Sequence, residues 1–582
     1  MEQPNYWERL ARKRLSRRKL LAAGGVAALG GGAALVVGCG GSDNKNGSSG
    51  GASGSSRPSG AAGGSPRPGG EVVFGRLLNV GGIDPHIDLT GLDIDTQLYS
   101  YLYNWDPINE VLLTNNFATA FEQPDPEHLD FIFSFRKGVL SGPNGGPAQG
   151  EELTSDDVRA TFIRRGTSLT APDKRFPYRI GGTNDVNKLV LALDQAIQTP
   201  DPYSLSFKMQ QPFVPSIREM ANPTWGIVPR KVIDKFGLRL SQQAYGSGPF
   251  MLEQFRGSER IKLVKNPNYF LSPRPWVDRI TYIVITEAAS LLAAFESGDH
   301  DVNGAVLTKK KFEEYQNDSR FTVARAPSLF YPCVEFKMKP PYSDIRVREA
   351  IDMAINRDDF IDAIWDGEAN YNGPIQWPQF KWSLPQDELR SFYTFNLDKA
   401  RANMEQAGYG DGFNARMKIP KVSGATFIAQ AAALIKEHLS KIKISIEIEE
   451  VEVGTFIASV ILPGNFEMTF FPNLPYDEPD RPLSFYHTRG VTGNGNWTNY
   501  TNPALDKLID AQSEEFDEEK RKQIIYEAQR MMIKEHGPQI TLPGGYAYSA
   551  RWSYVHFPFE IGQPTPKDIG PYNVDLWTEE GT

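Results

Sequence analysis

The side chains that could catalyse a reaction are scattered along this 582-residue chain. Histidine is the commonest general base and metal ligand, and the seven histidines are His86, His128, His300, His438, His487, His536 and His556. No two are four residues apart, and the sequence has no His-Glu-x-x-His, Gly-x-Ser-x-Gly or phosphate-binding loop. We therefore expect no catalytic residue, no metal and no cofactor. A hydrolase whose site is assembled only on folding remains an alternative.

One of the two cysteines, Cys39, ends a leader-like segment. Basic residues precede an apolar run over 20–37, and Val36-Val37-Gly38-Cys39 resembles a lipobox, at which cleavage leaves a lipid-bearing cysteine. Ser16-Arg17-Arg18-Lys19 looks like a twin-arginine export signal, a route for passengers that fold before export. The alternative is an uncleaved membrane anchor. Both place the remaining chain outside the cytoplasm, and the first attaches it to the cell membrane through lipid on Cys39.

Residues 40–70 are mostly Gly, Ser, Ala and Pro, a composition that predicts a flexible tether. The chain carries a net charge of −9, and the basic residues 1–19 carry +5, which leaves −14 for the rest. Such an acidic body argues against nucleic acid as a partner. With Cys39 lipidated, Cys333 has no disulfide partner, and its apolar neighbours predict a buried, inert thiol.

Local patterns predict a mixed α/β chain. Thr154 with Asp157 three residues later is a typical helix start. Helical spacing relates the apolar residues Ile351, Ala354, Ile355, Ile361 and Ile364. The segments 189–193 and 204–209 flank a Thr-Pro-Asp-Pro turn and predict a hairpin.

The second half of the chain gives two further local signals. Residues 425–441 have a helical pattern, and the alternation of isoleucines over 442–448 predicts a half-buried strand. Asn502 and Pro503 predict the start of a helical stretch that breaks near Asp517 and ends at Gly537-Pro538.

Several segments of the chain match short motifs of one known family. They are Phe133–Arg136 with Gly150–Val158 (G-x-x-L-T-A-x-D-V), Gly246–Phe250 (G-T-G-P-F), Lys265–Phe270 (R-N-P-x-Y-W), Pro340–Ala350 (P-P-F-x-D-x-R-V-R-Q-A) and Tyr500–Leu508 (Y-x-N-P-x-x-D-x-L). Each segment alone is a weak signal, but they follow the family's order over residues 71–545. Together they resemble the family-5 extracytoplasmic solute-binding proteins, the peptide-, nickel- and opine-type receptors of ABC importers.

The resemblance implies an α/β, two-lobed, periplasmic-binding-protein-like fold of type II with an extra subdomain, joined by a hinge. Ligand would bind between the lobes and close them. The expected organisation is a signal over 1–39, a tether over 40–70, lobe I from 71–113, 222–325 and 548–582, an inserted subdomain over 114–221, and lobe II over 326–547.

The resemblance also implies the ligand site. Peptide-binding members carry Trp-x-x-Asp-Tyr-x-(Asp/Glu)-Pro, whose first Asp meets the ligand's amino group, but the matching run Phe471–Pro479 has Pro475 at that position. A peptide ligand then needs Asp477 from a shifted loop. Some nickel-type members have Pro-Tyr-Asp here, so a metal chelate or other solute stays open. The predicted cleft residues are Tyr476, Asp477, Asn473, Asn496, Trp497, Tyr101, Asp106, Asp84, His86, Trp377 and Trp382.

Each cleft residue also has a structural alternative. Tyr476 and Asp477 could only shape a turn, Trp497 could cover a lobe surface, and a lone histidine such as His86 is more often structural than a ligand. The expected partners are a small-molecule or peptide ligand and the permease subunits of an ABC transporter, and we expect a monomer. A solute sensor that signals to a membrane protein is the alternative function.

Overall fold

The computed structural model describes residues 65–88, 90–106, 111–113, 116–142, 145–168, 175–183, 185–328, 331–375, 380–473, 478–492, 495–557 and 575–579. The predicted signal, Cys39 and most of the predicted tether lie outside these residues. Among the described residues, no helix has both the length and the apolar character needed to span a bilayer.

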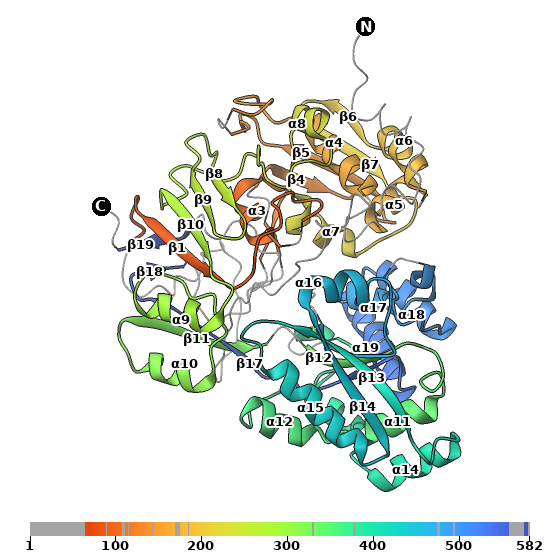
Figure 1. Cartoon of the computed structure of the whole chain (residues 1–582). Coiled ribbons are helices and arrows are strands. Elements are labelled where there is room, and N and C mark those ends of the chain that lie inside the picture. The colour runs from red at the N-terminus through yellow and green to blue at the C-terminus, as the bar shows by residue number, and fades with distance from the viewer. Residues whose placement is uncertain are drawn as a thin grey trace, which may run out of the picture.

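A four-stranded sheet near the start of the chain forms the first body. Its strands, in spatial order, are β1 (Glu71–Arg76), β10 (Arg279–Val284), β9 (Arg260–Lys265) and β8 (Phe250–Arg256). β1 and β10 are parallel, and the other pairs are antiparallel. The helices of this region are α3 (Leu92–Leu98), α8 (Arg230–Phe236), α9 (Ala288–Glu296) and α10 (Lys309–Gln316). The carboxyl-terminal hairpin of β18 (Val555–His556) and β19 (Trp577–Thr578) returns to this body (Figure 1).

The glycines of the Gly246–Phe250 segment have a steric reason. A Cβ on Gly246 would lie 2.2 Å from the carbonyl oxygen of Leu98, and one on Gly248 would lie 2.5 Å from that of Gln97. Gly248 N–H donates to the Leu98 carbonyl at 3.1 Å. The segment therefore packs directly on the backbone that ends α3, an approach that only glycine permits.

The chain between the first body's strands builds a separate antiparallel sheet. Its strands are β4 (Ala118–Glu122), β5 (Asp130–Phe135), β7 (Ser204–Lys208) and β6 (Gln198–Asp201), in that order. Its helices are α4 (Ser155–Thr167), α5 (Arg175–Gly181), α6 (Val186–Ala196) and α7 (Pro215–Glu219). Its core is rich in aromatic rings, and Phe131 stacks on Phe207 with 4.9 Å between ring centroids. These elements occupy the region predicted as an inserted subdomain, whose exact boundaries stay a prediction.

The predicted hairpin is wrong in its first strand. Residues 189–193 lie within α6, which begins after Asp185, whose side chain accepts from Asn187 N–H at 3.0 Å. Leu189 and Leu193 are one helical turn apart and both are buried, so the apolar run packs as a helix face. The strand that pairs with β7 is instead β6, and the turn falls between Asp201 and Ser204.

A five-stranded mixed sheet forms the second lobe. Its strands, in order, are β14 (Ile444–Glu452), β13 (Phe413–Lys421), β15 (Met468–Asn473), β12 (Tyr331–Phe336) and β16 (Gln539–Thr541). β13 is parallel to β14 and β15, whereas β12 is antiparallel to β15 and β16. The main helices are α11 (Ile345–Ala354), α12 (Arg357–Trp365), α13 (Gln386–Phe392), α14 (Leu397–Gln406), α15 (Phe427–Ser440), α17 (Asp480–Ser484), α18 (Pro503–Glu514) and α19 (Glu518–Lys534).

Most of the local predictions in this part of the chain are confirmed. The strand predicted from alternating isoleucines is β14, and α15 precedes it. The Asn502 side chain accepts from the Ala504 N–H at 3.0 Å at the start of α18, and Asp517 caps α19. The helical spacing from Ile351 to Ile364 is also confirmed, and it falls in α11 and α12, which are separated at Asn356, the cap of α12.

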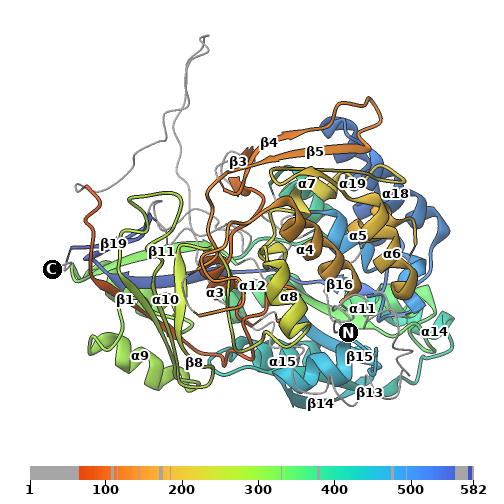
Figure 2. The same ribbon diagram turned by 90° about the horizontal axis from the view of Figure 1, so that it is seen from above.

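Two strands connect the bodies. β11 (Phe321–Pro327) runs antiparallel to β17 (Tyr546–Trp552), with Phe321 opposite Trp552 and Pro327 opposite Tyr546. β11 leads from the first body toward β12 of the second lobe, and β17 returns from β16 (Figure 1). Seen from above, the inserted sheet and the second lobe lie on one side of the molecule and the first sheet on the other (Figure 2).

Candidate functional site

A polar loop of the second lobe contains two of the predicted cleft residues. Asn496 is buried, and its amide donates to the carbonyls of His487 at 3.2 Å and Tyr500 at 2.8 Å. Its side-chain oxygen accepts from Thr498 Oγ1 at 2.9 Å. These bonds make Asn496 the residue that organises the loop. Its role in binding stays a prediction.

Trp497 is half-buried at the edge of this loop, and side chains of distant segments fix it. Its indole Nε1–H donates to Glu335 Oε2 at 2.5 Å, and its ring packs against Phe485 with 4.7 Å between centroids. The Lys337 ammonium donates to its carbonyl oxygen at 2.7 Å. The tryptophan is therefore held in one orientation. Its contact with a ligand stays a prediction.

The carboxyl group that holds Trp497 is buried. Glu335 lies in β12 with no exposed surface, and the Tyr486 hydroxyl also donates to it, at 3.3 Å. Burial raises the pKa of Glu335 from 4.5 to about 7, although the hydrogen bonds from Trp497 and Tyr486 oppose that rise. The group therefore changes its charge near neutral pH.

The predicted cleft residues Asp84 and His86 form a buried polar cluster with Arg164 of α4. Arg164 Nη1 donates to Asp84 Oδ1 at 2.9 Å and to His86 Nδ1 at 2.6 Å, and its Nη2 forms an ion pair with Asp84 Oδ2. The opposite ring nitrogen of His86 donates to the Gly226 carbonyl at 2.9 Å. Burial, and then the charge of Arg164, lowers the pKa of His86 well below its usual value, so the imidazole stays neutral. These bonds give both residues a structural role, and their ligand contact stays a prediction.

The remaining candidates differ in what the structure says of them. Tyr101 is buried, and its hydroxyl donates to the Pro223 carbonyl at 3.1 Å. Trp382 packs in the second lobe, where its carbonyl accepts from Gln529 at 2.7 Å. Asn473 is the last residue of β15 and Asp106 the last of β2 (Asn104–Asp106). Three candidates lie outside the described residues, namely Tyr476, Asp477 and Trp377.

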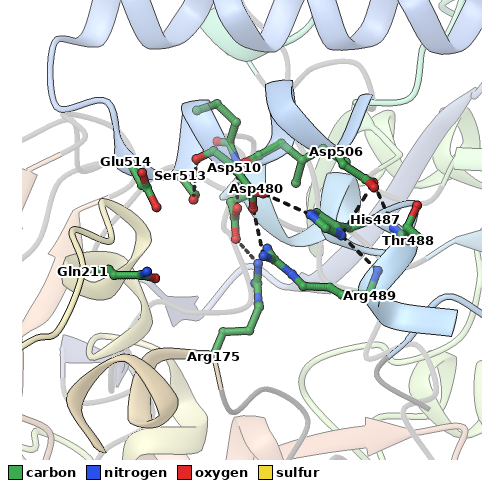
Figure 3. Close-up of polar contacts among 12 residues, drawn as sticks. Arg175, Gln211, Asp480, His487, Thr488, Arg489, Asp506, Asp510, Ser513 and Glu514 are labelled. Carbon is green, nitrogen blue, oxygen red and sulfur yellow. Dashed lines mark hydrogen bonds and ion pairs between the residues drawn. The ribbon is translucent and has the colours of Figure 1, made fainter. Parts of the chain in front are cut away.

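An ion pair links the inserted sheet to the second lobe directly beside the predicted ligand run. Arg175 of α5 pairs with Asp480, which opens α17 (Figure 3). The Asp480 side chain is only 1% exposed, and its other oxygen accepts from Gln512 at 2.6 Å. Glu478, two residues earlier, is paired with Arg521. The end of the run Phe471–Pro479 is therefore paired within the second lobe, and the residue that follows the run, Asp480, is paired with the inserted sheet.

Further contacts widen this interface. Arg179 of α5 donates to Glu514 Oε1 at 3.2 Å and to Ser513 Oγ at 3.4 Å. The Val214 backbone N–H donates to the Ser513 carbonyl at 2.9 Å. The rings of His128 and Phe516 stack with 4.1 Å between centroids. The inserted sheet and the second lobe thus meet through hydrogen bonds, two ion pairs and a ring stack.

A protein metal site generally brings several ligand side chains close together. Among the described residues, no group of three or more His, Cys, Asp or Glu is placed to hold a metal ion. Cys333 is buried, as the sequence predicts, and its thiol donates to the Phe471 carbonyl at 3.2 Å.

Two α/β lobes connected by a pair of antiparallel strands, β11 and β17, are typical of two-lobed binding proteins. Comparison with solved structures finds the same fold. The peptide-bound DppA structure from Helicobacter pylori is 21% identical, covers 88% of this chain and 99% of its own, and has a TM-score of 0.73. The structure of AgaA in complex with agropinic acid from A. tumefacien R10 is 20% identical with the same coverage and a TM-score of 0.75. The predicted two-lobed α/β fold is confirmed.

Sequence comparisons give the family. The family model "Bacterial extracellular solute-binding proteins, family 5 Middle" matches residues 148–496, more than half of the chain. The oligopeptide-binding protein AppA of Bacillus subtilis is 24% identical over 511 residues, which are 82% of this chain and 84% of that protein. The chain belongs to the family-5 bacterial extracellular solute-binding proteins.

The sequence did not reveal the residues that join the parts. Arg175 and Asp480 are 305 positions apart, and neither belongs to a recognisable motif. Glu335 did give a signal that could have been used, because it is the only acid in the apolar strand Tyr331–Phe336. A lone acid in such a strand predicts a specific partner.

Proposed function

We propose that the protein is an extracytoplasmic receptor that binds a peptide or other small organic solute between its lobes and delivers it to an ABC importer. The observation that carries this proposal is the family match over residues 148–496. The chain also folds as two lobes that are connected by the two strands β11 and β17. Its Bacillus relative is an oligopeptide-binding protein, and the H. pylori structure holds the peptide STSA. The mechanism is binding and closure, with no bond made or broken.

Peptides are the first ligand class to test. The run Phe471–Pro479 lacks an acid at Pro475, so the ligand's amino group needs another carboxylate, and Asp477 is the nearest in sequence. If Asp477 does not serve, the pocket favours a solute without a free amino terminus. The agropinic acid in the AgaA complex is a non-peptide example in the same fold.

Contacts beside the predicted ligand segment Phe471–Pro479 support closure of the two lobes. The Arg175–Asp480 pair and the Arg179–Glu514 pair join the inserted sheet to the second lobe. A ligand that touches both lobes adds contacts only when they are together, so binding shifts the population toward the closed form. We propose that these pairs belong to the closed form and break on opening.

The site of action follows from the leader. We propose that the twin-arginine signal exports the folded protein, that lipid on Cys39 holds it at the membrane, and that the segment 40–70 lets a monomeric body reach the permease. A sensor with the same fold would bind solute equally well. Loss of solute uptake on deletion of the protein would favour transport over sensing.

The test is mass spectrometry of the small molecules that leave the purified protein on denaturation, with a metal assay on the same sample. A peptide pool supports the peptide class. A single non-peptide solute or a metal chelate replaces that class and leaves the receptor standing. The matched variants are Asp477→Asn and the exposed Asp411→Asn. If Asp477 anchors an amino group, only the first loses the peptides.

A further inference from the structure

The carboxyl of Glu335 is fully buried in β12, where Trp497 and Tyr486 donate hydrogen bonds to it. β12 is the fourth strand of the second-lobe sheet, and its Val334 and Phe336 side chains enter the main core of that lobe. Glu335 points to the opposite face, because successive side chains alternate. A carboxyl in a protein interior costs stability unless it is well paired, and an apolar residue would fill the same space more favourably.

The two partners of Glu335 both come from the segment that contains the predicted cleft loop. Trp497 and Tyr486 are 162 and 151 positions away along the chain, and each donates one hydrogen bond to a different carboxyl oxygen. Lys337, two residues along from Glu335, fixes the carbonyl of the same tryptophan. Glu335 of β12 and Lys337 just after it thus hold Trp497 at its ring nitrogen and at its backbone carbonyl.

The position of Trp497 relates these hydrogen bonds to the binding of solute. Its ring packs against two apolar clusters, one containing Phe485 and the other containing Phe471 of β15. Phe471 opens the run that resembles the family's ligand-binding segment. Trp497 therefore belongs to the cleft loop and packs against the strand that leads into that run, and part of this half-buried residue is exposed.

We propose that Glu335 is a positioning residue that fixes the Trp497 indole so that its exposed surface forms one wall of the solute site. This inference rests on the proposed function, because it needs a solute in that site. The carboxyl accepts the indole hydrogen bond whether or not it is ionised, but the ionised form holds it more firmly. Solute affinity should therefore follow the ionisation of Glu335.

The groups around Glu335 keep this titration simple. The neighbour of Glu335 on the same face of β12 is Cys333, whose thiol donates to the Phe471 carbonyl at 3.2 Å. Just past the end of β12, the Lys337 ammonium donates to the Trp497 carbonyl and to Asn499 Oδ1. Thr469 of β15 and Gln539 of β16 lie directly opposite in the sheet. Burial raises the pKa of Glu335, and the hydrogen bonds from Trp497 and Tyr486 lower it. No neighbouring charge contributes to the shift.

The test uses the full chain, with an equimolar pool of random tripeptides as the probe, titrated by tryptophan fluorescence and calorimetry. The variants are Glu335→Leu, which removes the acceptor, Glu335→Gln, which keeps it without a charge, Trp497→Phe, and the double variant Glu335→Leu/Trp497→Phe. We expect the tripeptide concentration at half-saturation to rise about tenfold in Glu335→Leu and in Trp497→Phe. In Glu335→Gln it should rise less than twofold.

A shared role predicts that the double variant binds no more weakly than Trp497→Phe alone, because the two changes remove the same contact. It also predicts a pH dependence for the ratio of the half-saturation concentrations of the wild type and Glu335→Gln. This ratio should change at least twofold between pH 6 and pH 8. Since Glu335→Gln keeps the hydrogen bond and the fold, this comparison holds even if Glu335→Leu does not fold. Equal pH profiles, or additive losses, would overturn the inference.

The outcome also separates this inference from the proposed function. If the wild type does not respond to the tripeptide pool, the peptide function is overturned and the positioning role at a peptide site is overturned with it. If the wild type binds and all Glu335 variants bind equally well, the receptor stands and only the role of Glu335 is overturned.

Discussion

The buried carboxyl of Glu335 predicts how the stability of the protein depends on pH. The folded protein keeps the proton on this group up to a pH of about 7, whereas the unfolded chain loses it near 4.5. Between these values the folded state binds more protons than the unfolded state, so the free energy of unfolding falls as the pH rises. The stabilising contribution is complete below pH 4.5 and is lost by the time the pH has passed 7.

The size of the effect follows from the shift in pKa. Because each unit corresponds to about 1.4 kcal/mol, the change from 4.5 to about 7 amounts to about 3 kcal/mol between acidic and neutral pH. Glu335→Gln cannot titrate and keeps an acceptor for the indole of Trp497. We therefore expect the variant to match the wild type within about 1 kcal/mol at pH 5 and to exceed it by up to about 3 kcal/mol at pH 8.

Equilibrium unfolding in urea at pH 5, 6, 7 and 8 measures this difference. Burial also raises the pKa of Asp88, to about 6, and that group titrates in the same window. Its contribution is present in both proteins and cancels when the variant is compared with the wild type. If the two proteins lose stability in parallel from pH 5 to pH 8, the reasoning about Glu335 is refuted.

Three further predictions concern other parts of the molecule. Arg164→Ala leaves Asp84 buried and unpaired and should lower the free energy of unfolding by about 3–5 kcal/mol in urea, whereas Arg416→Ala at an exposed pair should cost less than about 1 kcal/mol. Arg175→Ala should weaken solute binding about fivefold in calorimetry, because it removes an interface pair, and Arg416→Ala should not. In a protein without Cys39, the buried Cys333 thiol should react with DTNB only after unfolding, and rapid labelling of the native protein would contradict the burial.

The parts of the fold that were predicted correctly depend on local rules. Helix caps such as Thr154 with Asp157 and Asn502 with its Pro503 act over two or three residues, so the sequence carries the whole signal. The alternation in β14 is also local. The apolar run over 189–193 was misjudged, because five apolar residues fit a strand or a helix face equally well and only the cap at Asp185 separates them.

The site was less predictable, because its groups come together only in three dimensions. The resemblance to the family predicts which loops line the cleft, but it did not show that the Asn496 side chain holds its own loop together. Nor did it show that Asp84 forms a buried ion pair with Arg164. Glu335 with Trp497 and Arg175 with Asp480 join segments more than 150 residues apart. No spacing rule reaches such pairs.

The most direct test of the account is small-angle X-ray scattering on protein first stripped of bound solute and then titrated with the solute that co-purifies with it. A receptor that closes predicts saturation at one solute per chain and a smaller radius of gyration in the loaded protein. An unchanged radius of gyration, together with no saturable binding of any co-purified solute or tripeptide, would contradict it.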